Sequence, residues 1–122
     1  MKKIRVLIAD DSALSRALLR EYLEQDDGIE VIAEARNGEE AVALALDLAP
    51  QVITMDVHMP KMDGLAAIAA IMTRRAVPIL VVSGVADAKV AYDALLRGAL
   101  DVISKPTIDA GDAIEFGTKL RL

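Results

Sequence analysis

The chain has no cysteine and no tryptophan, and its only aromatic residues are two tyrosines and one phenylalanine. Without cysteine, disulfide bonds and thiolate metal sites are excluded, which is compatible with a reducing, cytoplasmic environment. Hydrophobic residues nevertheless make up 54% of the 122 residues. The core must therefore be built from Ala, Val, Leu, Ile and Met.

Clusters of positive charge and long apolar runs are also missing. The formal net charge is −5 and no basic stripe occurs, so we expect no nucleic-acid partner. No apolar run approaches the roughly 20 residues of a membrane span, and we expect no membrane partner. The opening "MKKIRVLIADD" contains Arg5 and ends in two aspartates, so it predicts a first strand and not a signal peptide. The length suits a single domain, 1–122, which we also consider as one piece of a longer protein.

Short apolar segments alternate with longer segments of helical periodicity. We expect strands at 4–9, 29–35, 51–55, 78–83 and 101–105, and helices at 12–25, 38–49, 64–74, 86–98 and 110–120. Such alternation predicts an α/β fold, a three-layer, doubly wound parallel sheet with helices on both faces. Five strands favour the flavodoxin-like order 2-1-3-4-5 over a Rossmann order, because no G-x-G-x-x-G follows the first strand. Asn37 is a candidate N-cap and Gly98 a candidate C′ residue.

Polar residues stand where the expected strands end. Asp10 and Asp11 follow the first strand, Asp56 the third, Ser83 ends the fourth, and Lys105 ends the fifth. Because parallel strands share one carboxyl edge, these groups should meet at one rim, where α/β sheets bind ligands. The single ammonium of Lys105 cannot balance the charge of three carboxylates. A hard divalent cation, Mg²⁺ or Mn²⁺, would offset the remaining negative charge. Mg²⁺ typically binds through one or two carboxylates together with a phosphate, so the site anticipates a phosphoryl group.

Four short motifs together resemble the receiver domain of two-component response regulators. They are the acidic pair in "LIADDS", the loop "MDVHMPKMDG", the serine in "VVSG" and the ending "SKP". The resemblance covers essentially the whole chain. The wording of "IRVLIADDSALSR" and "GALDVISKP" is further similar to receivers of chemotaxis protein-glutamate methylesterases.

The resemblance implies a metal site and a phosphoacceptor. Asp56 would accept the phosphoryl group from a sensor histidine kinase, and Asp10 and Asp11 would hold Mg²⁺ together with Asp56 and the backbone carbonyl of His58. The chain would not be an enzyme in the usual sense. It would only transfer a phosphoryl group to itself and remove that group by hydrolysis. An effector such as a methylesterase would lie outside it.

The resemblance also implies a switch. Ser83 and Lys105 would bond the new phosphoryl oxygens and shift the loops that follow the fourth and fifth strands, for a downstream effector domain or partner protein. Receivers commonly place an aromatic residue three positions before the lysine, where this chain has Val102. A side chain this small cannot report the switch by the same rotamer change.

Each residue also has a structural interpretation. Asp11 or Ser12 suits an N-cap, Asp56 an Asx-turn, and Asp63 a turn or cap, while His58 suits a solvated loop. A haloacid dehalogenase-type hydrolase would need D-x-D after the first strand, and a nucleotide switch would need G-x-x-x-x-G-K-[ST]; both are absent. The remaining alternative is a non-phosphorylated pseudo-receiver that only binds proteins.

Overall fold

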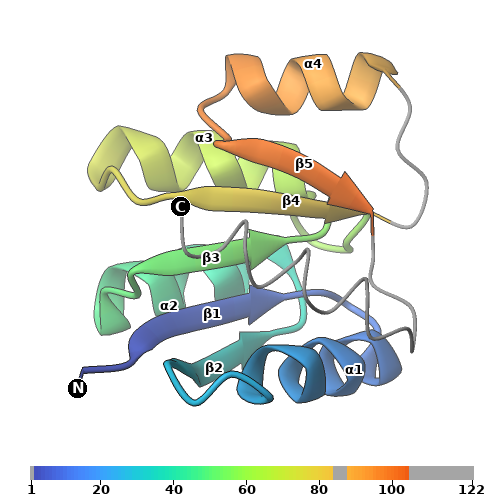
Figure 1. Ribbon diagram of the computed structural model, residues 1–122. Coiled ribbons are helices and arrows are strands. Elements are labelled where there is room, and N and C mark those ends of the chain that lie inside the picture. The colour runs from blue at the N-terminus through green and yellow to red at the C-terminus, as the bar shows by residue number, and fades with distance from the viewer. Residues whose placement is uncertain (1, 84–87, 105–122) are drawn as a thin grey trace.

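The computed structural model describes residues 2–83 and 88–104. Five strands form one parallel sheet, β1 (Ile4–Ala9), β2 (Ile29–Ala35), β3 (Val52–Met55), β4 (Ile79–Ser83) and β5 (Asp101–Ser104). Four helices connect them, α1 (Ala13–Glu24), α2 (Gly38–Leu48), α3 (Gly64–Arg74) and α4 (Ala88–Leu96). The strand order is β2-β1-β3-β4-β5, so the predicted flavodoxin-like α/β fold is confirmed (Figure 1).

Alternate residues of each strand point to opposite faces of the sheet and form two cores. On one face Val6 and Ile8 of β1 pack with Leu19 and Leu23 of α1. On the other face the buried residues of β1, β3 and β4 pack against α2, α3 and α4, and this core is rich in Ala and Ile. Figure 1 shows α1 on one side of the sheet and α2 and α3 on the other. Both faces of β1 and β3 are therefore covered, which explains their nearly uniform apolar sequences.

Side-chain caps begin three of the helices. Ser12 accepts a hydrogen bond from the backbone N–H of Ser15, and Asn37 accepts one from Glu40. Asp63 caps α3 through the backbone N–H of Ala66, at 2.8 Å. The predicted N-cap role of Asn37 and the cap interpretation of Asp63 are confirmed, and the cap of α1 is Ser12.

The predicted elements agree with the observed ones within one or two residues wherever the structure describes them. Helix 12–25 is shorter by one residue at each end because those residues are its caps, and helix 38–49 ends at Leu48. Strands 51–55 and 78–83 each begin one residue later. Gly98 follows α4 with φ 113°, as expected for a left-handed C′ residue. The helix predicted at 110–120 lies outside the described residues, as do the first residues of helix 86–98 and the last of strand 101–105.

The end of α2 is held by a cation from β1. The Arg5 guanidinium donates hydrogen bonds to the carbonyls of Leu48 and Ala49, both at 2.8 Å. These carbonyls have no partner within the helix, and a positive charge at a helix C-terminus is favourable. The helix ends abruptly because Ala49 adopts a left-handed backbone conformation, with φ 49°.

We predict that Ala49→Gly stabilises the protein by about 1 kcal/mol, since glycine adopts a positive φ without the clash of a Cβ. Urea unfolding followed by circular dichroism measures the change. The control is Ala43→Gly, at an exposed interior position of α2. That change should cost about 1 kcal/mol. Destabilisation by both substitutions would show that the left-handed cap is not strained.

The start of α2 carries an ion pair that depends on pH. The side chain of Arg36 lies 2.9 Å from Glu40, and its backbone N–H donates to the same carboxylate. These hydrogen bonds from Arg36 lower the pKa of the Glu40 carboxyl to about 2. A depressed folded-state pKa stabilises the fold above the unfolded-state pKa near 4.5, and the contribution disappears as the pH falls toward 2.

We therefore predict that Glu40→Gln lowers stability at pH 6 and that the gap to the unmodified protein closes as the pH falls from about 5 to about 2. Urea titrations across this pH range measure the gap. Because the pair is exposed, the gap should also shrink at high salt. A gap that is constant with pH would assign the effect to something other than this carboxylate's charge.

Candidate functional site

Two neighbouring strands deliver two carboxylates to the carboxyl edge of the sheet. Asp10 directly follows β1 and Asp56 directly follows β3, and both are buried, with exposed fractions of 1% and 7%. The backbone N–H of Asp56 donates to the carbonyl of Ala9 at 2.9 Å, and that of Asp10 donates to Ala35 at 3.0 Å. The ladder of the sheet thus extends to both aspartates and fixes their backbones.

A third carboxylate, that of the exposed Asp11, joins them. Carboxylate oxygens of Asp10, Asp11 and Asp56 all lie within 4.8 Å of one another. Asp10 closes a local turn by accepting the backbone N–H of Ser12 at 2.9 Å, and Ser12 caps α1. The prediction that the ends of β1 and β3 bring three aspartates together at the switch point of the sheet is confirmed.

The loop after Asp56 is folded tightly against the backbone of Asp56. The backbone N–H of Gly64 donates to the carbonyl of Val57 at 2.8 Å. A Cβ on Gly64 would collide with the carbonyl of Asp56, so only glycine permits this approach. His58 lies in this loop with an exposed side chain, as the solvated-loop interpretation predicted. The start of α3 therefore presses directly on the backbone of Asp56.

The start of α2 supports the same loop from the side. Gly38 donates its backbone N–H to the carbonyl of Met62 at 2.9 Å, and a Cβ on Gly38 would collide with that carbonyl. Lys61, next to Met62, adopts a positive φ of 63°. The loop between β3 and α3 is thus held from two sides by two glycine contacts.

An ion-pair network that the sequence interpretation missed lies beside the acidic pair. The Arg16 guanidinium donates to the backbone carbonyl of Asp10 at 2.7 Å and to the Glu34 carboxylate of β2 at 3.1 Å. Arg20, one turn later on α1, donates to the other oxygen of Glu34 at 2.8 Å. The only sequence signal is the i, i+4 spacing of the two arginines, which does not reveal their partner in another element.

The donor set suits a hard divalent cation. It consists of carboxylate oxygens, two of them from buried residues, and the described part of the chain adds no thiolate or imidazole to the cluster. Mg²⁺ and Mn²⁺ prefer such oxygen ligands. In a partly buried position, three carboxylates also create the negative potential that attracts a cation.

The remaining predicted residues lie at or beyond the limits of the described structure. The backbone of Ser83 ends β4 and pairs with Ser104 of β5. Lys105 lies outside the described residues. Val102 is partly buried and packs against the core shared by α2, α3 and α4.

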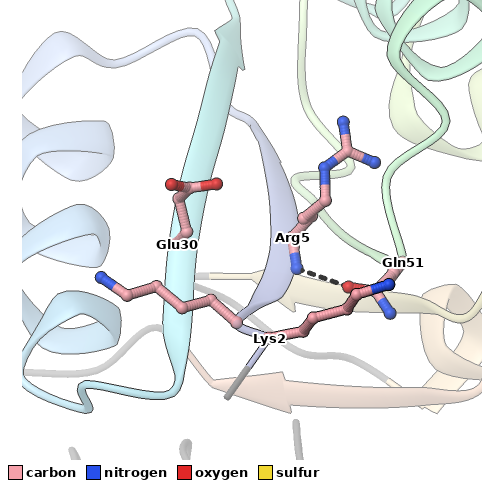
Figure 2. Close-up of a pocket in the computed structure, with 5 residues that line it drawn as sticks. Lys2, Arg5, Glu30 and Gln51 are labelled. Carbon is pink, nitrogen blue, oxygen red and sulfur yellow. Dashed lines mark hydrogen bonds between the residues drawn. The ribbon is translucent and has the colours of Figure 1, made fainter.

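A shallow pocket lies at the amino ends of the strands, away from the aspartates. It has a volume of about 570 Å³ and is lined by Lys2, Lys3, Arg5, Glu30 and Gln51. Figure 2 shows the backbone N–H of Arg5 bonded to the Gln51 side chain. The guanidinium of Arg5 donates its hydrogen bonds to the backbone carbonyls at the end of α2. Arg5 and Gln51 thus connect segments of the chain here, and the carboxyl edge remains the candidate site.

No helix in the described part of the chain has the length and apolarity to cross a membrane.

Comparison with known proteins identifies a family. Residues 6–114 match the model of the response regulator receiver domain. A protein-glutamate methylesterase/protein-glutamine glutaminase of Paramagnetospirillum magneticum is 52% identical over 98% of this chain and 34% of its own length. Another, from Carboxydothermus hydrogenoformans, is 59% identical over 87% of this chain and 30% of its own length. The chain therefore spans about a third of the length of these relatives.

Solved structures agree with this assignment. The response regulator domain of Thermotoga maritima CheB is 35% identical, with a TM-score of 0.90 over 98% of this chain and 95% of its own. A chain of the CheX-CheY-BeF₃-Mg²⁺ complex from Borrelia burgdorferi matches with a TM-score of 0.88 at 27% identity, over 99% of this chain and 91% of that one. With its sheet order, its acidic cluster and these relatives, the chain belongs to the response regulator receiver domains of two-component signalling and is related to those of chemotaxis protein-glutamate methylesterases.

Proposed function

We propose that this receiver domain is a Mg²⁺-dependent phosphoacceptor switch in which Asp56 accepts a phosphoryl group from a sensor histidine kinase. The observation that carries the proposal is the cluster of Asp10, Asp11 and Asp56, whose oxygens lie within 4.8 Å of one another. Asp56 stands at the end of a fully buried strand and its backbone is bonded to Ala9. A nucleophile held this rigidly meets the positional demand of phosphoryl transfer.

The cation site would comprise the carboxylates of Asp10, Asp11 and Asp56 with the backbone carbonyl of His58. Bound Mg²⁺, or Mn²⁺ in its place, neutralises charge that develops on the phosphoryl oxygens. The rest of the site prepares Asp56. Its backbone is fixed by β1 and by the start of α3, so its carboxylate is presented to a donor at the carboxyl edge of the sheet.

The reaction transfers one phosphoryl group. An oxygen of the Asp56 carboxylate attacks the phosphorus of a phosphohistidine, the P–N bond breaks, and its electron pair returns to the imidazole nitrogen, which takes up a proton. Lys105 would stabilise the negative charge shared by the attacking and transferred oxygens. Water later attacks the phosphorus of the aspartyl phosphate, and the P–O bond to Asp56 breaks, which restores the carboxylate and releases phosphate.

The switch would follow from the new charge. The Ser83 hydroxyl and the Lys105 ammonium would bond the phosphoryl oxygens and draw in the ends of β4 and β5. Ser83 and Ser104 are paired across these two strands, so movement of one strand end would displace the other. Val102 is too small to rearrange as an aromatic residue would, so the response would depend on the backbone after β4 and on α4.

The output lies beyond this chain in our proposal. The chain would be a single receiver domain, 1–122, acting in the cytoplasm on a downstream effector domain or partner protein of chemotaxis-type signalling. The methylesterase names of the relatives and their threefold greater length support an effector outside this chain. The chain itself would perform only phosphotransfer to Asp56 and its reversal by hydrolysis. A non-phosphorylated receiver that only binds proteins is the alternative.

We predict that Mg²⁺ and acetyl phosphate add the mass of one phosphoryl group to the chain, at Asp56. Intact-protein mass spectrometry measures the adduct, and beryllofluoride with Mg²⁺ should shift the amide NMR signals around the same residue. Asp56→Asn should abolish both effects, because an amide is not a nucleophile here. Asp63→Asn, which preserves a cap, is the matched control and should retain both. No adduct and no shift in the unmodified protein would favour the protein-binding alternative.

Our division of roles predicts that Ser83→Ala still becomes phosphorylated but responds less. The methyl group removes the hydroxyl that would bond the phosphoryl oxygen, while Asp56 and the cation site are untouched. The extent of phosphorylation by mass and the beryllofluoride-induced amide shifts in α4 and β5 separate the two effects. Loss of phosphorylation itself would move Ser83 from the switch to the transfer step.

A further inference from the structure

Arg16 contacts the main chain of the acidic pair, Asp10 and Asp11, and not the carboxylates of the pair. Its Nη1 donates to the main-chain carbonyl of Asp10 at 2.7 Å, while its Nε bonds Glu34 at 3.1 Å. The side chain is only 13% exposed, so the contact is shielded from water. A guanidinium presents separate donors in a fixed plane, so one arginine can join two acceptors from different elements.

Hydrogen bonds hold the backbone of Asp10 at both its N–H and its carbonyl. The N–H is held by Ala35 of β2 and the carbonyl by Arg16 of α1. Asp10 also closes a turn with the N–H of Ser12. The peptide before Asp10 is therefore held by β2, and the peptide that joins Asp10 to Asp11 is held by α1 through its carbonyl. Its orientation sets the direction in which the Asp11 side chain leaves the backbone.

Glu34 fixes the arginine in turn. One carboxylate oxygen accepts from Arg16 and the other from Arg20, at 2.8 Å. Glu34 offsets the positive charge of the arginine. Arg16 can therefore bond the carbonyl of Asp10 without an aspartate carboxylate as its counterion. Arg20 also lies 3.9 Å from the carboxylate of Glu24 on its own helix, and its side chain is 40% exposed.

We propose that Arg16 is a positioning residue of the acidic site: by holding the carbonyl of Asp10, it orients the Asp10 and Asp11 carboxylates for a divalent cation. This inference rests on the proposed function. Groups that orient metal ligands without touching the metal commonly change its affinity by about 10- to 100-fold when they are removed.

The sign of the effect separates this role from simple electrostatics. Deleting a positive charge near a cation site removes repulsion, so charge alone makes Mg²⁺ bind more tightly to Arg16→Met. Loss of positioning makes Mg²⁺ bind more weakly. A residue that only stabilises the fold lowers the melting temperature and leaves the affinity for Mg²⁺ unchanged.

The experiment is a titration of the whole chain with MgCl₂, followed by the amide NMR signals of Asp10, Asp11 and Asp56. We expect Arg16→Met to raise the Kd for Mg²⁺ about tenfold. The matched control is Arg20→Met, which removes the same charge one turn away, one bond to Glu34 and the ion pair with Glu24. It should leave the Kd within about twofold, because exposed ion pairs contribute little.

A kinetic measurement provides the second readout. With acetyl phosphate as donor, Arg16→Met should require about tenfold more Mg²⁺ for half-maximal phosphorylation while the rate at saturating Mg²⁺ stays within about threefold. Arg16→Lys keeps the charge but has one ammonium for two acceptors, so it should show the same change in smaller degree. If Arg16→Met does not fold, Arg16→Lys takes its place in both measurements.

Three outcomes overturn the inference. Equal or tighter Mg²⁺ binding by Arg16→Met, or by Arg16→Lys if only that variant folds, would show that Arg16 does not position the ligands. An equal loss in Arg20→Met would assign the effect to Glu34, which both arginines bond, and not to the bond with the Asp10 carbonyl. If the unmodified chain itself binds no Mg²⁺, the proposed function fails and the inference fails with it.

Discussion

The hydrogen bond from the N–H of Asp56 to the carbonyl of Ala9 joins the two strands on which the site depends. β1 and β3 are neighbours because the chain reverses its direction of progress across the sheet between β2 and β3. Helices that cover the sheet on opposite faces diverge at such a point, which leaves its carboxyl edge open. Two carboxylates from segments more than 40 residues apart thus stand on adjacent strands, in an extension of the same ladder.

The surrounding loops serve this junction. Two glycines let the starts of α2 and α3 approach the loop after Asp56 more closely than any side chain permits. On the other side, Arg16 and Glu34 connect α1 and β2 to the backbone of Asp10. The contacts with Asp10, Asp56 and Met62 act on main-chain atoms. The arrangement is a frame around charged groups, which suits the positional demand of the proposed phosphoryl transfer.

The structure also separates residues that the sequence presents as similar. Asp56 and Asp63 lie in the same loop, and either one is a reasonable cap when taken alone. Asp63 caps α3, whereas Asp56 is buried beside Asp10. Asp11 and Ser12 likewise both precede α1, and the cap is Ser12, which leaves Asp11 in the acidic cluster. In each pair, one residue satisfies the helix end and the other remains for the site.

The sequence by itself determined the alternation of strands and helices, the strand order and the meeting of three aspartates. Apolar periodicity is a local property, and parallel strands share one carboxyl edge whatever their side chains. Asn37 and Gly98 were also predictable, because a cap depends on its own few residues. Only the tertiary structure decided the partners of Arg16, the glycine contacts with Asp56 and Met62, and the Arg5 bonds that end α2. These contacts join elements distant in the chain, and their geometry arises only when the helices pack on the sheet.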